Sequence, residues 1–215
     1  MLGTIYKGAR ALHKGVMITL LCVGVAEAQQ RVVAFGDSLT AGFGLPVSEG
    51  FVPQLEAWLQ GQGADVIVVN AGVSGDTTSG GLSRVGWVLG EGADLVILEL
   101  GANDMLRGVA PSVARANLDA ILADITGRGI KVLVAGMLAP PNYGAAYRAE
   151  FDAIYPELAE EHGAELYPFF LAGLGKAEGL VAFYGLMQAD GMHPNAEGVM
   201  MIVEDMGPAV LAALE

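Results

Sequence analysis

The sequence predicts a three-layer, doubly wound α/β domain, in which a mostly parallel five-stranded sheet has helices on both faces. The first observation is a regular alternation of short apolar runs with longer amphipathic segments from residue 31 onward. The second is that the runs are apolar throughout, which is typical of strands buried on both faces of a parallel sheet. The third is size: 215 residues, 53% of them hydrophobic and 16% charged, suit one domain with a large core.

The five expected strands follow one another at intervals long enough for a helix between each pair. The first, "RVVAF" at 31–35, is rich in β-branched residues, as strands usually are. The others are "ADVIVVN" at 64–70, "DLVILEL" at 94–100, "KVLVAGM" at 131–137 and "AELYPFF" at 164–170.

Helices are expected between these strands and after the last one. They lie at 50–63, 77–92, 111–129 and 144–163, and a final helix begins near Asn195 and runs towards Leu214. Glycines weaken the second of these segments. The third is the best helix, with Pro111 suited to its first turn and glycines 127 and 129 to its end.

Two stretches fit this pattern less well. Pro156 lies inside the fourth expected helix and predicts a kink or an interruption there, since proline cannot donate the helical hydrogen bond. Residues 171–187, "LAGLGKAEGLVAFYGLM", have no assignable element, and we expect them to cover one edge of a site.

Residues 1–28 have the pattern of a secretory signal peptide. Three basic residues precede an apolar stretch at 15–25, and the segment ends in the small-residue pattern Ala26-Glu27-Ala28. The apolar stretch is short for a bilayer span, so we expect cleavage, no membrane span in the remaining 31–215 domain, and a periplasmic or secreted location. An uncleaved N-terminal anchor is the alternative. The single cysteine, Cys22, lies in this segment, so the mature domain is expected to have no disulfide.

The charge of the chain excludes one class of partner. The formal net charge is -13, and no basic stripe is present in the body of the chain. Binding to nucleic acid depends on clustered lysine and arginine, so a nucleic-acid partner is not expected.

Small polar residues and glycines gather in loops that the predicted topology brings to one end of the sheet. "GDSLTAG" at 36–42, "NAGVSGDTT" at 70–78 and "GANDMLRG" at 101–108 each follow a strand, and "ADGMHPN" at 189–195 precedes the last helix. Ligands of such sheets bind outside the carboxyl ends of the strands. A functional site is therefore expected where these four loops meet.

Ser38 has two interpretations. A serine at the turn from a strand into a helix is most often a helix N-cap. It is a nucleophile where the turn exposes its hydroxyl and a base is within reach. The rest of the sequence must decide between the two.

Histidines offer the candidate base. Of the three in the chain, His13 belongs to the expected signal peptide, and His162 precedes a glycine that resembles a helix C-cap, which suits a surface residue. His193 lies in the "ADGMHPN" loop, three residues after Asp190. That spacing allows the carboxylate to contact the far ring nitrogen, so His193 and Asp190 are predicted to serve Ser38 as base and orienting acid.

Donors for an oxyanion are also present in these loops. Ser38 offers its own N–H, Gly75 offers an N–H that no side chain shields, and Asn103 offers its amide N–H₂. Singly each residue has a plainer interpretation, since Gly75 suits a turn and Asn103 suits a cap.

The blocks "GDSL", "SGDT", "GAND" and "DGMHP", in this order, resemble the four blocks of the SGNH (GDSL) hydrolase family. The resemblance runs from residue 32 into the last helix. It is nearest to the branch of the periplasmic thioesterase I/protease I/lysophospholipase and related arylesterases, although residues 171–187 follow that branch poorly.

This resemblance implies roles for particular residues. Ser38 is the implied nucleophile, Asp190 and His193 complete the triad, and Gly75 and Asn103 donate to the oxyanion with the Ser38 N–H. The loop from Met105 to Ala110, which includes Leu106, is implied to lie beside an acyl-binding groove. Tyr143 is a further candidate for the groove, with ordinary packing as the alternative for it and for Met105.

The neighbouring acids have plainer interpretations. Asp37 and Asp104 are expected to be buried hydrogen-bonding residues, and Asp76 is expected near a helix N-terminus. No metal and no cofactor are expected, because catalytic zinc needs several His or Cys ligands. A carboxylate-bound Mg²⁺ at Asp37 and Asp190 stays open, although nothing requires it.

The predicted function is that of an exported serine esterase or thioesterase acting on a small-molecule or lipid acyl ester. A carbohydrate O-deacetylase is the alternative within the same chemistry. A flavodoxin-like cofactor binder is less favoured, because "GDSLTAGFG" has neither the lysine of a P-loop nor the spacing of a dinucleotide motif. A non-catalytic binding module would have no need of the Ser38, Asn103, Asp190 and His193 set.

Overall fold

Five parallel strands form one sheet in the order β2-β1-β3-β4-β5. The structure is a computed structural model that describes residues 1, 3 and 28–215. The strands are β1 (Gln30–Gly36), β2 (Val66–Gly72), β3 (Leu95–Glu99), β4 (Lys131–Ala135) and β5 (Glu165–Tyr167). The predicted fold class is confirmed, and the sheet is parallel throughout. Nearly all of the expected signal segment, Cys22 included, lies outside the described residues.

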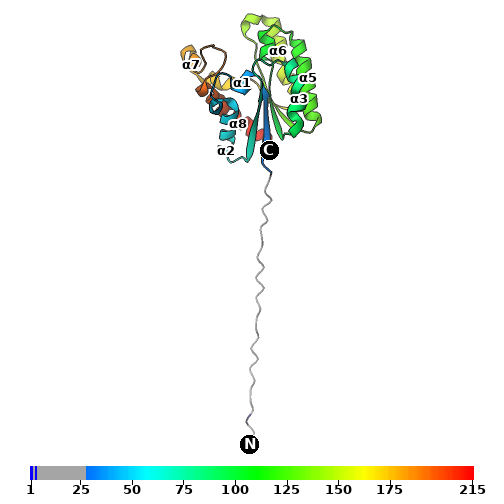
Figure 1. The fold of residues 1–215 in the computed structure, drawn as a ribbon, viewed down its shortest axis with the longest axis vertical. Coiled ribbons are helices and arrows are strands. Elements are labelled where there is room, and N and C mark those ends of the chain that lie inside the picture. Colours follow the sequence, from blue (N-terminus) through cyan, green and yellow to red (C-terminus); the bar gives the residue numbers. More distant parts are fainter. Residues whose placement is uncertain (2, 4–27) are drawn as a thin grey trace.

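Helices cover both faces of the sheet, as expected for a doubly wound domain (Figure 1). One face carries α3 (Thr78–Val88), α5 (Pro111–Gly127) and α6 (Ala145–His162), which pack in that order. The other carries α2 (Phe51–Gly61) against α8 (Ala196–Leu214). All five residues of β3 are buried, which explains why the strand is apolar from Leu95 to Leu98 and leaves Glu99 as a buried acidic residue at its end.

Short helices lie in the connections. They are α1 (Ser38–Ala41), α4 (Ala102–Leu106) and α7 (Leu180–Gly185), with 3₁₀ turns η1 (Val47–Glu49), η2 (Leu89–Glu91), η3 (Pro141–Tyr143) and η4 (Ala172–Lys176). Both α1 and α4 begin immediately or soon after a strand ends. They therefore lie at the carboxyl edge of the sheet.

The interruption expected at Pro156 is not found. One helix, α6, runs unbroken through this residue, and α8 likewise runs through Pro208. Pro156 is exposed, whereas Phe151, Ile154 and Leu158 of the same helix are buried in the core. Burial of this apolar stripe offsets the hydrogen bond that the proline cannot donate.

The last strand is shorter than expected. It ends at Tyr167, and residues 168–170 leave the sheet, with the Phe170 N–H donating back to the Gly136 carbonyl at 2.8 Å. The backbones approach closely here, because a Cβ on Gly136 would lie 2.4 Å from the Pro168 carbonyl oxygen. Pro168 itself has no N–H for a sheet ladder.

Residues 171–187 form η4 and α7 rather than a strand or a long helix. Leu180, Val181 and Tyr184 of α7 are exposed, and this helix lies at the margin of the domain (Figure 1). Within the 28–215 part of the chain, no helix has the length and hydropathy required to cross a bilayer.

Candidate active site

Four loops meet at the carboxyl edge of the sheet and line one cavity of about 370 Å³. Ser38 follows β1, Gly75 follows β2, Asn103 follows β3, and His193 lies just before α8. The sequence prediction that these loops converge is therefore confirmed. The lining residues are Asp37, Ser38, Leu39, Phe43, Ser74, Gly75, Ala102, Asn103, Met105, Leu106, Met137, Leu138, Pro140, Phe169, Leu171, Met192 and His193.

Ser38 is not the N-cap of its helix. Asp37 is the capping residue, and its Oδ1 accepts the Leu39 N–H at 3.0 Å. This arrangement leaves the Ser38 hydroxyl available to a different partner. As the first residue of α1, Ser38 also has a backbone N–H that no helical hydrogen bond uses.

His193 connects Ser38 to Asp190. Its Nε2 lies 2.9 Å from the Ser38 Oγ, and its Nδ1 lies 2.6 Å from the Asp190 Oδ2. The histidine ring faces one partner on each side, which is the arrangement that a serine nucleophile with a general base requires. Serine and histidine are 155 residues apart in the chain.

Asp190 is held as an anion by its own loop. Its Oδ1 accepts the backbone N–H of His193 at 3.0 Å and that of Met192 at 2.9 Å. These two backbone bonds, with the side-chain bond to His193, lower the pKa of Asp190 to about 2. The carboxylate is therefore ionised and oriented towards the ring at neutral pH.

An aromatic ring supports the histidine on another side. The Phe43 ring lies 4.6 Å from the His193 ring, centroid to centroid, and the planes are inclined by 39°. Phe43 was not singled out from the sequence. Its position just after the "GDSLTAG" loop gives a weak signal, since many aromatic residues near loops serve only in packing.

Gly75 and Asn103 lie on the same cavity as Ser38. Gly75 has φ +79°, a conformation that favours glycine, and its carbonyl accepts a hydrogen bond from the exposed Arg107 guanidinium at 2.7 Å. Within residues 28–215, no protein acceptor takes the Gly75 N–H. The Asn103 Nδ2 donates one hydrogen to the Asp37 Oδ2 at 2.8 Å, which leaves its second hydrogen for a ligand.

Arg84 ties the first two of these loops together and was also missed from the sequence. Its guanidinium donates to the Gly36 carbonyl at 2.9 Å and to the Ala71 carbonyl at 2.7 Å. It pairs with Asp76 at 2.7 Å and lies 4.2 Å above the Phe35 ring. One side chain therefore fixes the ends of β1 and β2 and the loop that contains Gly75.

The acids beside the site have the structural roles expected of them. Asp104 is buried and accepts hydrogen bonds from the N–H and the hydroxyl of Thr78, at 2.8 and 2.7 Å. Asp37 is equally buried, and burial is the main reason that its pKa is raised. Asp76 lies just before the α3 N-cap, Thr77, whose N–H it accepts.

A further buried acid, Glu99, lies behind the turn that holds Ser38. Its Oε2 accepts the Asp37 N–H at 3.1 Å and the Thr40 hydroxyl at 2.9 Å. Burial, and then the neighbouring Asp37 charge, raise the pKa of Glu99 well above its usual range. Its place at the end of an apolar strand was the available signal, because a charged residue there needs a reason to be buried.

Of the three residues that the sequence suggested for the groove, two line the cavity and one does not. Met105 and Leu106 line the cavity as expected. Tyr143 does not line it, and its ring lies 5.4 Å from that of Tyr147. His162, which the sequence placed at the surface, has a side chain only 15% exposed, and its Nε2 lies 2.6 Å from the Asp119 Oδ1. It does not line the cavity that contains Ser38 and His193.

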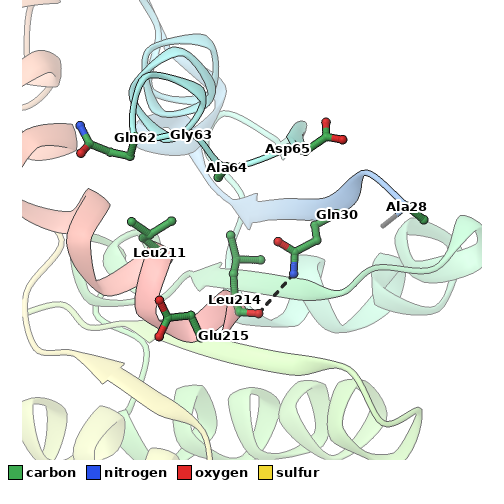
Figure 2. Close-up of a pocket in the computed structure, with 9 residues that line it drawn as sticks. All are labelled: Ala28, Gln30, Gln62, Gly63, Ala64, Asp65, Leu211, Leu214 and Glu215. Atoms are coloured by element: carbon green, nitrogen blue, oxygen red, sulfur yellow. Dashed lines mark hydrogen bonds between the residues drawn. The ribbon is translucent and has the colours of Figure 1, made fainter. Parts of the chain in front are cut away.

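A second cavity, larger than this one, lies elsewhere in the domain. It has about 720 Å³ and is lined at the opposite, amino-terminal end of the sheet by residues of β1, the loop before β2 and the end of α8 (Figure 2). Gln30 lines this cavity, and its side-chain amide donates to the Leu214 carbonyl at 3.2 Å. It contains no pairing of a nucleophile with a histidine, so the smaller cavity is the candidate site.

The described residues contain no group of three or more His, Cys, Asp or Glu side chains arranged to hold a metal ion. Asp37 and Asp190, which the sequence left open as a pair for Mg²⁺, each use their oxygens for protein hydrogen bonds. Asp37 binds Leu39 and Asn103, whereas Asp190 binds its own loop and His193.

Relatives of known activity align over most of the chain. It is 39% identical over 202 residues to esterase TesA of Pseudomonas aeruginosa, covering 94% of this chain and 98% of the relative. It is 38% identical to an arylesterase of Vibrio mimicus, covering 87% and 92%. The thioesterase 1/protease 1/lysophospholipase L1 of Escherichia coli is 34% identical, with 90% and 89% covered.

Solved structures of esterases also resemble this chain. The esterase AlinE4, described as an SGNH-hydrolase family esterase, superposes with a TM-score of 0.71 at 45% identity, covering 87% of this chain and 98% of the other. The TesA crystal structure superposes with a TM-score of 0.77 at 39% identity, covering 86% and 99%. The family model for GDSL-like lipase/acylhydrolases matches residues 34–200. The chain belongs to the GDSL-like lipase/acylhydrolase family, as its four sequence blocks predict.

Proposed function

We propose that this protein is an exported serine esterase that hydrolyses acyl esters and acyl thioesters through a covalent acyl-enzyme. The observation that carries the proposal is the continuous contact from Ser38 Oγ to His193 Nε2 and from His193 Nδ1 to Asp190, at the wall of an apolar cavity. The relatives named esterase, arylesterase and thioesterase support the same class of bond.

Acylation begins at the serine. Ser38 Oγ attacks the acyl carbon while His193 Nε2 takes the hydroxyl proton, and the carbonyl oxygen becomes negative as the carbon turns tetrahedral. The Ser38 and Gly75 N–H groups and the free Asn103 amide hydrogen stabilise that oxygen. His193 then returns the proton to the alcohol or thiol as the bond to the leaving group breaks.

Deacylation repeats these steps with water. His193 takes a proton from water, whose oxygen attacks the acyl-enzyme carbon, and collapse of the second tetrahedral species releases the acid and returns the proton to Ser38. Asp190 stays ionised throughout, stabilising the imidazolium and fixing the proton on Nδ1. Its low pKa suits that part, because the carboxylate does not compete for the proton.

The lining of the cavity favours an apolar acyl group. Met105, Leu106, Met137, Leu138 and Phe169 supply most of the wall beyond the polar catalytic edge. Such a surface gains free energy by removing methylene groups from water, about 0.8 kcal/mol for each. The proposed substrates are esters of apolar acyl groups with aryl or glyceryl leaving groups, and thioesters of the same acyl groups.

Export is the second part of the proposal. The basic, apolar and small-residue regions of segment 1–28 support cleavage after Ala28 and a periplasmic or secreted location. Measuring the N-terminal residue of protein recovered from the culture medium or the periplasm tests this part. A chain that starts at Met1 in the membrane fraction would contradict it.

A substrate panel tests the hydrolase proposal. Purified wild type, Ser38→Ala and the matched control Ser74→Ala, which removes a hydroxyl from the same cavity, are assayed on aryl acetates, longer acyl esters, acyl-CoA and acetylated sugars. We expect Ser38→Ala to lose activity and Ser74→Ala to keep it. We expect the wild-type protein to prefer esters of longer acyl chains. Preference for acetylated sugars would instead identify a carbohydrate O-deacetylase.

A further inference from the structure

Glu99 lies behind the active site without taking part in the proposed reaction. It is the last residue of β3, its side chain is completely buried, and Oε2 accepts both the Asp37 N–H and the Thr40 hydroxyl. The contact is tight, because a Cβ on Gly36 would lie only 2.5 Å from the same oxygen. A carboxyl group in such a place is costly unless its polar atoms are satisfied.

The second carboxyl oxygen of Glu99, Oε1, indicates whether this side chain is ionised or protonated. Oε1 is buried and receives no hydrogen bond from an amide, hydroxyl or amine of residues 28–215, and it is the one side-chain atom of this kind there. An ionised carboxylate would leave this oxygen charged and unsatisfied. A protonated carboxyl makes it a donor instead, which removes the buried charge.

Asp37 is the acceptor for that proton. The two acids are neighbours, because the Asp37 N–H donates to Glu99 Oε2 at 3.1 Å and the Asp37 charge contributes to the raised pKa of Glu99. Two carboxyl groups this close can form a hydrogen bond with each other only when one of them holds a proton. The better anion is Asp37, since its oxygens also accept the Leu39 N–H and the Asn103 amide. The proton therefore belongs to Glu99.

We propose that Glu99 is a positioning residue that remains a neutral carboxylic acid and donates its O–H to Asp37, so that Asp37 holds the Asn103 amide towards the oxyanion. Glu99 touches neither the substrate nor the reacting atoms. The inference deepens the proposed function and rests on it, because the orientation of Asn103 matters for catalysis only if an oxyanion forms beside Ser38.

The groups around Glu99 favour its neutral form. Asp37 faces it from the turn at 36–39, and the Asp37 carboxylate repels a further negative charge on Glu99. From α6, Tyr155 donates its hydroxyl to the Leu100 carbonyl, and burial raises the pKa of this phenol well above its usual range. The nearest cation on α3, Arg84, is bound to Asp76 and to backbone carbonyls.

Infrared difference spectroscopy tests the charge state without any assay of activity. Spectra of wild-type protein and Glu99→Gln are recorded in D₂O at neutral pH, where ordinary carboxyl groups are ionised. We expect a carboxylic-acid C=O band in the wild type that is missing in the variant. Wild-type spectra without that band would overturn the proposal.

Kinetics test the positioning role. Glutamine places an amide N–H₂ where the neutral acid has its O–H, so Glu99→Gln is expected to keep kcat within about threefold of wild type. Glu99→Ala is expected to lower kcat by ~10-fold or more with little change in KM, because it loosens a donor used only in the transition state. A folded Glu99→Gln that is as slow as Glu99→Ala would contradict the proposal.

A double-mutant cycle with Asn103→Ala separates positioning from general damage. If Glu99 acts through Asn103, then Glu99→Ala lowers kcat by about twofold or less in the Asn103→Ala background. If the kcat losses of the two single variants instead multiply in the double variant, Glu99 does not act through Asn103 and the proposal is overturned. Ile125→Ala, a buried change in α5 away from the site, is the control for lost stability.

Full hydrolysis by Ser38→Ala would refute the proposed function while leaving the infrared result intact.

Discussion

Asn103 Nδ2 donates to Asp37 Oδ2 at 2.8 Å, so the residue before Ser38 holds a side chain that lines the same cavity as Ser38. The same Asp37 caps α1 through the Leu39 N–H. One buried carboxylate thus fixes both the turn that exposes Ser38 and the amide proposed to stabilise the oxyanion. The two parts of the site cannot move independently without breaking one of these bonds.

Replacing Asn103 with Ala is therefore expected to lower kcat by ~10²-fold or more with little effect on KM, as for other single oxyanion donors. Steady-state kinetics on one aryl ester measures both constants. Asn117→Ala is the control, because that amide contacts Thr78 and does not line the cavity. A wild-type kcat in Asn103→Ala would remove this residue from the oxyanion site.

Replacing Asp190 with Asn is expected to lower kcat by ~10²-fold or more, since the amide favours the wrong tautomer of His193. The substitution keeps the shape of the side chain, so KM is expected to change little. Unchanged kcat in this variant would show that His193 needs no orienting carboxylate.

The low pKa of Asp190 also predicts how stability depends on pH. Its folded-state pKa of about 2 lies below the value of ~3.9 for an unfolded aspartate, so the carboxylate stabilises the folded chain above pH ~4. This contribution is lost as the pH falls towards 2. Melting temperatures of wild type and Asp190→Asn, measured from pH 2 to 5, are expected to converge at the acid end. A constant difference across that range would contradict the assignment.

Arg84 is expected to control the geometry of the site through the ends of β1 and β2. Arg84→Lys keeps a charge but cannot make the three directed contacts to Gly36, Ala71 and Asp76. We expect kcat to fall by ~10-fold or more at temperatures where the variant remains folded, with KM nearly unchanged. Arg128→Lys, which alters an exposed pair on α5, is the control. Equal effects of the two substitutions would exclude a positioning role.

Leu106 is expected to select for acyl chain length. It is 55% exposed at the wall of the cavity, so a charge there is tolerated by the fold but not by an apolar chain. Leu106→Asp is expected to lower kcat/KM for esters of eight or more carbons by ~10-fold and for acetates by about twofold or less. Leu106→Met is the matched apolar control. An equal loss on both esters would place the acyl chain elsewhere.

Periodicity and residue order predicted the fold well, because apolar strands and intervening helices follow directly from burial on both faces of the sheet. The convergence of Ser38, Gly75 and Asn103 was predictable for the same reason, since each follows a strand end and the strand ends of a parallel sheet meet at one edge. The loop of His193 follows no strand directly, and its place was predicted from the chemistry that Ser38 requires.

The interruption expected at Pro156 was wrong because tertiary packing stabilises the helix through this residue, and no local rule reveals that packing. Arg84 and Glu99 were missed because their roles depend on contacts with partners that lie far away in the sequence.

The most direct measurement for the proposed mechanism is mass spectrometry of the chain after a brief reaction with an acyl ester or an organophosphonate. One adduct is predicted, on the peptide that contains Ser38, absent in Ser38→Ala and formed at least ~10²-fold more slowly in His193→Ala. An adduct on a different residue, or equally rapid labelling of Ser38→Ala, would contradict the proposed nucleophile.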